Sequence, residues 1–251
     1  MIENYPPQEE QPPQPLVIEA PEDDAKPVVA YALIGISIAI YLLQVLTKWQ
    51  FGLDIPAALG VKANAQIMAG QYWRLFTPAL LHGSPVHIFF NMYALYVIGF
   101  GLEKRFGHLR FALLYIAGAF AGNVLSFLLS ANPSLGASTS IFGLLGAELV
   151  FYYKNKELFG PNAKRAIQQV VTVAAINFII GLTPGIDNWG HLGGFLGGLL
   201  YAWISGPILQ FTIEPPVIRV VEPGKSTFLS VVGLLAVLLI FSALMFTKIN
   251  I

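Results

Sequence analysis

Long segments without a charged residue constrain this chain more than any other feature of its sequence. Segments 28–47 and 227–246 contain no Asp, Glu, Lys or Arg, and each has the roughly 20 residues that a helix needs to cross a bilayer. Charged residues make up 11% of the chain, whereas soluble domains usually have about 25%. The sequence therefore predicts a protein embedded in lipid.

Five further apolar segments lie between these two, so we predict an all-α integral membrane protein with seven spans. The second, fourth and sixth spans are shorter than the others and contain more Gly, Ser, Asn and His. Polar groups within a span usually face the inside of a helix bundle and line a site. The five segments are approximately 87–102, 111–130, 138–153, 166–182 and 190–205.

The composition divides the chain into three parts. Segment 1–27 contains seven prolines and seven acidic residues, and such a segment cannot bury enough apolar area to fold. We expect it to be a disordered cytoplasmic tail. It has neither the apolar run of a signal peptide nor the Arg-rich pattern of a mitochondrial presequence. Residues 28–206 would form a six-span core, and residues 207–251 a linker and the seventh span.

The basic residues of the predicted loops favour a cytoplasmic N-terminus. In that orientation ten Lys and Arg residues lie on the inner side and four on the outer side, as the positive-inside rule requires. The C-terminus and the long loop 49–86 would then lie outside. Because this loop contains several aromatic residues, we expect a partly helical element at the membrane interface. A compact chain without a targeting peptide is expected in a prokaryotic plasma membrane.

Charge balance and residue counts exclude several kinds of site. Fourteen basic and fourteen acidic residues cancel, so no basic field supports nucleic-acid binding. Cysteine is absent, which excludes disulfides, thiolate zinc sites and cysteine nucleophiles. The four histidines do not have the spacing of a metal-binding motif such as H-E-x-x-H. We therefore predict neither a metal nor another cofactor.

Three polar clusters begin the second, fourth and sixth predicted spans. A polar cluster within a membrane is a candidate functional site, and in the predicted topology all three clusters enter from the outer side. They can therefore lie at one depth. The clusters are 82–91 with His82, His87 and Asn91, 136–143 with Ser138, and 187–198 with Asp187 and His191.

These clusters contain the groups that acyl transfer requires. Ser138 would begin a helix, where free backbone N–H groups face a developing anion. His191 could accept a proton, and His87 and Asn91, on one helix face, could donate hydrogen bonds. Ser138 alone could instead be a helix N-cap. Asp187 could orient the His191 ring or favour its protonated form, and the spacing leaves both open.

In these residues the chain resembles the rhomboid family of intramembrane serine proteases. The resemblance covers about 72–201, roughly half of the chain, and implies a rhomboid-like bundle of six core transmembrane helices plus a seventh, C-terminal one. It further implies that Glu103 and Arg105 are structural anchors. The motifs are Trp73-Arg74, His82-x4-His87-x3-Asn91, Glu103-x-Arg105, Gly136-x-Ser138 and His191-x2-Gly194-x3-Gly198.

The resemblance also implies a role for each residue of the site. Ser138 would be the nucleophile and His191 the general base of a dyad that has no essential third carboxylate. His87 and Asn91 would form an oxyanion hole with the Ser138 backbone N–H group. His82 would be an auxiliary polar residue near a water-filled cavity.

One position departs from the family pattern, in which a glycine usually follows the serine. Here Thr139 follows Ser138. A glycine lets a neighbouring backbone approach closely, whereas a threonine would reshape the pocket or cap the start of the helix. The change removes no group that transfers protons.

The sequence therefore predicts an intramembrane serine endopeptidase that cuts peptide bonds in or near transmembrane segments of membrane proteins. Its expected partners are these substrates and the lipid bilayer, without nucleic acid. One alternative is a catalytically inactive rhomboid-like protein that binds transmembrane clients, although both Ser138 and His191 are present. A small transporter would need internal repeats or several acidic residues at mid-membrane depth, and only Glu148 lies there.

Overall fold

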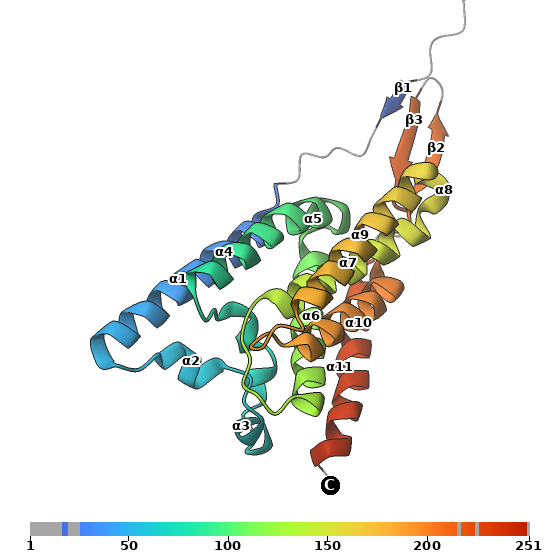
Figure 1. Ribbon diagram of the computed structural model, residues 1–251. Helices are drawn as coiled ribbons and strands as arrows, with labels where there is room; N and C mark the ends of the chain where they lie inside the picture. Colours follow the sequence, from blue (N-terminus) through green and yellow to red (C-terminus); the bar gives the residue numbers. More distant parts are fainter. Residues whose placement is uncertain (1–16, 20–25, 215–216, 224–225, 250–251) are drawn as a thin grey trace, which may run out of the picture.

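A computed structural model describes residues 17–19, 26–214, 217–223 and 226–249 as a mostly helical bundle (Figure 1). Each apolar segment that the sequence predicts as a span coincides with a helix. The second is made of α4, a π-helical turn η3 and α5, which follow one another without a break. The helices are α1 (Val28–Phe51), α4 (Pro85–Ala94), η3 (Leu95–Gly99), α5 (Phe100–Phe106), α6 (His108–Leu129), α7 (Ser138–Lys154), α8 (Lys156–Phe159), α9 (Pro161–Ile180), α10 (Asn188–Ser205) and α11 (Thr227–Ile249).

Four of the described helices are long and apolar enough to cross a membrane. They are α1, the α4–α5 rod, α6 and α11. Helices α7, α9 and α10 occupy the positions of the fourth, fifth and sixth predicted spans. Helix α7 has only 17 residues, α7 and α10 begin with polar clusters, and α9 contains Lys164 and Arg165 near its start. The fold is of the predicted class, and the exact count of six spans plus one stays a prediction.

The loop between α1 and α4 is partly helical, as predicted. It contains α2 (Ile55–Gly60), α3 (Asn64–Met68) and two 3-10 turns, η1 (Tyr72–Leu75) and η2 (Thr77–Leu80). The buried Arg74 guanidinium braces it by donating hydrogen bonds to the carbonyls of Val61 (2.9 Å) and Ala58 (2.8 Å).

Glu103 and Arg105 join helices at the end of α5. The buried Glu103 carboxylate accepts hydrogen bonds from the backbone N–H groups of Val29 (2.9 Å) and Ala30 (2.7 Å). These are free donors in the first turn of α1, which a carboxylate stabilises. The Arg105 guanidinium forms a 3.2 Å ion pair with Glu148 of α7. Both residues therefore make structural contacts, as the family resemblance implies.

Helix α10 packs tightly between α6 and α7 because its faces are lined by glycine (Figure 1). A Cβ atom added to Gly194 or Gly198 would overlap a backbone carbonyl oxygen of α7, and one added to Gly193 or Gly197 would overlap Ala121 of α6. Small residues at this spacing let helix backbones approach closely. The packing brings the first turns of α7 and α10 together.

We expect Gly198→Ala to lower the thermal unfolding temperature in detergent micelles. The new methyl group would clash with the Gly143 carbonyl oxygen, and overpacking of this kind costs about 1–3 kcal/mol. Gly35→Ala is the matched control because no atom lies within 4 Å of its Cβ position on α1. Equal unfolding temperatures for the two variants would show that the α7–α10 contact does not limit stability.

A three-stranded sheet lies at one end of the bundle and differs from the prediction. Strand β1 (Val17–Glu19) pairs in parallel with β3 (Val217–Val221), and β3 pairs antiparallel with β2 (Gln210–Glu214). The prediction of disorder for segment 1–27 is therefore wrong at β1, and the linker after residue 206 forms a hairpin. β-branched and aromatic residues in both arms favour the hairpin, and its open edge accepts the short third strand. The rest of the predicted tail, 1–16 and 20–25, lies outside the described residues.

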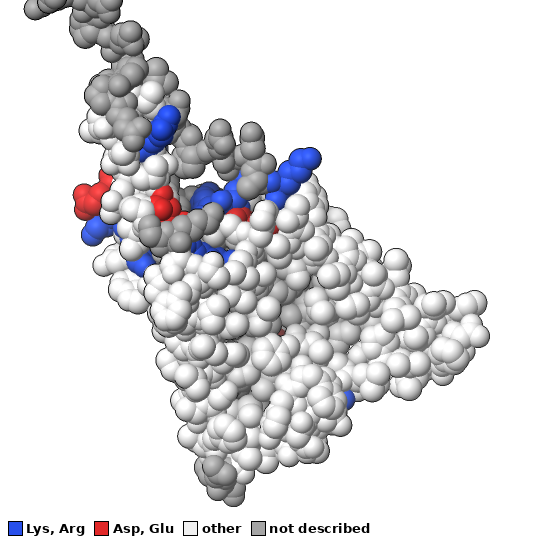
Figure 2. Space-filling model, turned by 180° about the vertical axis from the view of Figure 1, so that it is seen from behind, with Lys and Arg blue, Asp and Glu red and all other residues white. Residues whose placement is uncertain are grey.

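Charged side chains gather near this sheet. Figure 2 shows them at one end of the visible face, whereas the rest of that face is almost free of charge. The buried Arg110 of α6 forms an ion pair of 2.5 Å with Glu222, directly after β3. This distribution suits a bundle whose sides lie in lipid. The predicted cytoplasmic orientation of this end stays a prediction.

Two lysines cap the other end of α6, where the last carbonyl groups lack partners within the helix. The ammonium group of the buried Lys62 donates hydrogen bonds to the carbonyls of Ser130 (3.1 Å) and Asn132 (2.7 Å). The ammonium group of Lys248, from α11, donates to the carbonyls of Phe127 (2.6 Å) and Leu128 (3.0 Å). The first loop and α11 are thereby joined to the same helix end.

We expect the stability contribution of Lys62 to increase at alkaline pH. Burial lowers the pKa of Lys62 to about 8 from its ordinary value of 10.5. Between these two pH values the unfolded chain binds more protons than the folded chain, so the free energy of unfolding rises with pH. The unfolding temperature of the parent, measured relative to Lys62→Met, should rise from pH 7.5 to pH 10. A constant difference across this range would contradict the assigned shift.

Candidate active site

Ser138 and His191 contact each other directly, although 53 residues separate them in the sequence. Ser138 is the first residue of α7, and His191 lies in the first turn of α10. The distance between Ser138 Oγ and His191 Nε2 is 3.0 Å. The imidazole ring stacks on the Phe142 ring, with 4.3 Å between centroids and 12° between planes. The close packing of α7 and α10 thus places a hydroxyl and an imidazole within hydrogen-bond reach.

Asp187 does not contact the His191 ring through a hydrogen bond. Its carboxylate accepts a hydrogen bond from the Gly190 backbone N–H group at 2.9 Å and another from the Ser126 hydroxyl. Within the described part of the chain, His191 Nδ1 is buried and has no hydrogen-bond partner. Asp187 therefore makes no hydrogen bond that would orient the His191 ring, and its carboxylate instead fixes the first turn of the helix that carries the histidine. Ser138 and His191 form a pair of side chains without a third carboxylate in hydrogen-bond contact.

His87 and Asn91 line the same cavity as Ser138 and His191. The cavity has a volume of about 810 Å³. Ser84 places these residues because its hydroxyl caps α4, accepting a hydrogen bond from the His87 backbone N–H group at 3.1 Å. Asn91 follows one turn later and is buried. The structure therefore brings together four of the five predicted site residues around one space.

Gly136 allows His87 to approach the serine. Its φ of +136° disfavours side chains, and a Cβ atom there would lie 2.7 Å from His87 Nε2. Its backbone N–H group donates a 2.9 Å hydrogen bond to the Pro78 carbonyl. The glycine in Gly136-x-Ser138 therefore provides room for the imidazole.

His82, the fifth predicted residue, lies behind His87 and does not line the cavity. Its side chain is buried, and neither ring nitrogen has a hydrogen-bond partner among the residues that the structure describes. Its ring contacts that of His87 edge to face, with 5.2 Å between centroids. The Gln44 side chain holds His82 toward α1 by accepting a hydrogen bond from its backbone N–H group at 3.1 Å. Its auxiliary role stays a prediction.

Thr139 fits because glycines on two other helices leave space for it. A Cβ atom on Gly122 of α6 would lie 2.7 Å from Thr139 Cβ, and one on Gly190 of α10 would lie 3.1 Å from Thr139 Cγ2. The threonine is buried and also lines the cavity. The departure from the family pattern is thus matched by small neighbours, and the contact between Ser138 and His191 is retained.

Two residues of the site were not predicted from the sequence. Phe142 could have been found, because it lies four residues after Ser138 and therefore on the same face of α7. Ser126 gives no such signal, since a serine near the end of an apolar helix is unremarkable in sequence. In the described ranges no group of three or more His, Cys, Asp or Glu side chains could hold a metal ion.

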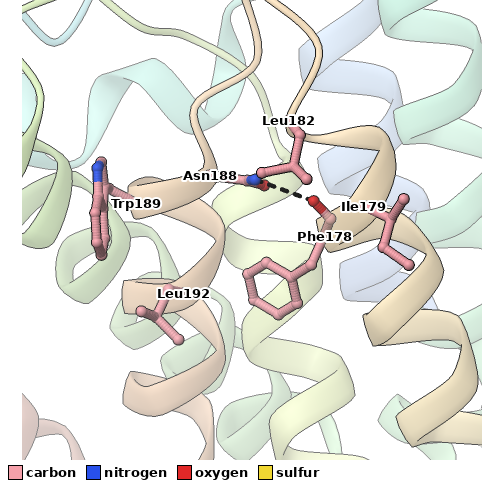
Figure 3. A pocket seen from close by; sticks show the side chains of 6 residues that line it. All are labelled: Phe178, Ile179, Leu182, Asn188, Trp189 and Leu192. Carbon is pink, nitrogen blue, oxygen red and sulfur yellow. Dashed lines mark hydrogen bonds between the residues drawn. The ribbon is translucent and has the colours of Figure 1, made fainter.

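A second pocket, of about 530 Å³, lies between α9 and α10 (Figure 3). Its lining is apolar apart from Asn188, whose amide group donates a 3.0 Å hydrogen bond to the Phe178 carbonyl. It holds no ionisable side chain. The chemistry of the site therefore belongs to the larger cavity.

Comparisons with known proteins identify the family of this chain. Residues 69–208 match the family model of the Rhomboid domain. The chain is 35% identical over 184 residues to Rhomboid protease GluP of Bacillus subtilis (strain 168), covering 73% of this chain and 36% of that protein.

Two Arabidopsis thaliana proteins are also similar. Identity is 35% over 159 residues with RHOMBOID-like protein 9, chloroplastic, covering 63% of this chain and 37% of that protein. Identity is also 35%, over 127 residues, with Inactive RHOMBOID-like protein 8, covering 50% of this chain and 36% of that protein. The chain thus covers about a third of each relative.

The relatives include a chloroplastic protein, so the comparisons do not favour a prokaryotic membrane, which stays a prediction. The family model spans more than half of the chain and contains all three polar clusters. Four helices are apolar enough to cross a bilayer. On these grounds the protein is a multi-pass membrane protein that belongs to the rhomboid family.

Proposed function

We propose that this protein is an intramembrane serine endopeptidase that cuts transmembrane proteins. The observation that carries the proposal is the 3.0 Å contact between Ser138 Oγ and His191 Nε2 in a cavity that His87 and Asn91 also line. A nucleophile, a base within hydrogen-bond reach and nearby donors are the parts of an acyl-transfer site.

In this proposal Ser138 attacks the scissile carbonyl while His191 Nε2 accepts the hydroxyl proton. A tetrahedral intermediate forms, and the protonated imidazole then gives this proton to the leaving amine, which breaks the peptide bond. Water next attacks the acyl-enzyme, and His191 takes the proton of that water and returns it to Ser138. His191 Nε2 thus accepts and then passes on both protons, first that of the serine hydroxyl and then that of the water.

The oxyanion would be stabilised by three donors, namely the Ser138 backbone N–H group and the side chains of His87 and Asn91. His87 Nδ1 accepts a 3.4 Å hydrogen bond from the Gly83 backbone N–H group. In a neutral ring this leaves the proton on Nε2, the nitrogen that approaches Gly136. The tautomer therefore suits His87 as a donor toward the space beside Ser138.

The shape of the cavity supports a transmembrane segment as substrate. Residues of both α4 and α9 line it, among them Phe90 and Tyr93 of α4 and Val173 and Ile180 of α9. Helix α9 buries few side chains against the bundle, so we propose that a substrate segment enters the cavity from the lipid between these two helices. A substrate segment would have to unwind locally there, because an intact helix uses its carbonyl groups internally.

The second candidate is a catalytically inactive rhomboid-like protein that binds transmembrane clients. Two observations favour it: Thr139 stands where the family usually has glycine, and one similar protein is named inactive. This reading requires the cavity to bind a client without cutting it.

Cleavage of a tagged single-span protein in liposomes separates the two candidates. The assay compares the parent with Ser138→Ala, His191→Ala and the control Ser226→Ala. This control changes a serine at the start of α11 whose hydroxyl accepts a hydrogen bond from the Leu229 backbone N–H group. Cleavage by the parent and the control alone supports the protease. Binding without cleavage across a panel of single-span proteins, together with no labelling of the parent by a serine-reactive fluorophosphonate, would support the client-binding protein.

A further inference from the structure

We infer that Asp187 is a positioning residue for His191 and that Ser126 of α6 holds Asp187 in place. The inference rests on the proposed protease function, because it concerns the base of that reaction. It assigns a role to a carboxylate that is close to the site but does not touch the reacting groups.

Asp187 organises the first turn of α10 through three hydrogen bonds. Its carboxylate accepts one from the Gly190 backbone N–H group at 2.9 Å, and its backbone carbonyl accepts one from the His191 backbone N–H group at 3.0 Å. The other carboxylate oxygen accepts a hydrogen bond from the Ser126 hydroxyl. A capping aspartate usually serves one helix, whereas this one joins the start of α10 to the end of α6.

Ser126 is a firm anchor because its helix end is fixed from two sides. The residue is fully buried. Lys62 of the first loop donates hydrogen bonds to carbonyls at this end of α6, and Lys248 of α11 donates to two more. Helix α11 lies outside the matched rhomboid domain and thus contributes to the anchor.

The site needs such an anchor because, among the described residues, no side chain forms a hydrogen bond with His191 Nδ1 that would orient the imidazole. His191 Nδ1 has no hydrogen-bond partner in the ranges that the structure covers, so the ring direction depends on the Phe142 stack and on the position of the first turn of α10. A displacement of about 1 Å at a reacting group can cost about 100-fold in rate. Loss of the Asp187–Ser126 link should therefore lower kcat without changing how substrate binds.

Three substitutions of Asp187 separate capping from positioning. Asp187→Asn keeps an oxygen for the Gly190 N–H group and an amide that reaches Ser126. Asp187→Ser keeps a good helix cap but is too short to reach Ser126. Asp187→Ala keeps neither. Ser126→Ala removes the link from the other side and leaves the cap intact.

We expect kcat to stay close to the parent value in Asp187→Asn, to fall about 10-fold in Asp187→Ser and Ser126→Ala, and to fall up to about 100-fold in Asp187→Ala. KM should stay unchanged in all four. The rate at which a fluorophosphonate labels Ser138 should fall in the same order. Ser226→Ala removes the cap of α11 and controls for the loss of a cap elsewhere, so it should keep the parent kcat.

Parent-like kcat in Asp187→Ser or in Ser126→Ala would overturn the inference and leave Asp187 as a helix cap only. An equal loss of kcat in Asp187→Asn and Asp187→Ala would also overturn it, because the negative charge of Asp187, and not its hydrogen bond with Ser126, would then determine the rate. If the parent neither cleaves nor is labelled, the protease proposal fails. Hydrogen exchange of the backbone amides in the first turn of α10 then tests whether Ser126 holds Asp187 in place. If it does, exchange should be faster in Asp187→Ser and Ser126→Ala than in Asp187→Asn.

Discussion

Ser138→Ala is expected to lower the rate of substrate cleavage in liposomes by about 10⁶-fold, the loss that removal of a serine nucleophile causes in other serine proteases. Among the described residues, Ser138 carries the one hydroxyl that forms a hydrogen bond with His191 Nε2. Without the Oγ atom no acyl-enzyme can form, and only direct attack by water remains. The measurement is the rate of product formation, followed by mass spectrometry at saturating substrate.

His191→Ala should cause a similar loss, and the double variant should be no slower than either single variant. The two side chains act as one unit through the 3.0 Å contact, and the effects of such units are not additive. Unchanged substrate binding by Ser138→Ala would show that the cavity is intact. Cleavage by Ser138→Ala at a rate near that of the parent would exclude Ser138 as the nucleophile, and additive losses would contradict the dyad.

His87→Ala and Asn91→Ala are each expected to lower kcat by about 10²–10³-fold, the usual cost of removing one oxyanion donor. Both residues line the cavity beside Ser138. A donor that meets the oxyanion only in the transition state contributes little to substrate binding, so KM should change little. The measurement is a full kinetic analysis in liposomes, with kcat and KM determined separately for each variant.

Asn162→Ala is the matched control for Asn91→Ala, because Asn162 is exposed near the start of α9. It should retain the kinetics of the parent. A rise in KM at constant kcat in either oxyanion variant would reassign that residue to substrate binding. Full activity in one variant would remove that residue from the oxyanion hole and leave the other donors to carry the stabilisation.

The positions of the helices could be predicted because each depends on a local pattern. Uncharged apolar runs place α1, α6 and α11 within a few residues of where the sequence predicts them. The polar clusters that begin α7 and α10 were recognisable for the same reason. The sequence did not predict the sheet, because β1 has only three residues in a segment rich in proline and acidic residues. Its pairing with β3 is also a contact between distant parts of the chain.

The arrangement inside the cavity depended on contacts between helices. Gly136 and Ser138 indicate a helix start in the sequence, but the sequence does not state that Gly136 makes room for His87. Whether Asp187 would orient the His191 ring or favour its protonated form was likewise open. The structure assigns its carboxylate to Gly190 and Ser126.

By itself the sequence determined that the protein lies in a membrane, which helices it forms and which residues offer a nucleophile, a base and hydrogen-bond donors. These properties follow from runs, spacings and residue types along the chain. Only the tertiary structure decided that Ser138 lies 3.0 Å from His191, that His82 stands behind the cavity and that Ser126 holds Asp187. The physical reason is that each of these depends on how helices rotate and how closely their glycine faces pack, and one chain's local pattern does not specify either.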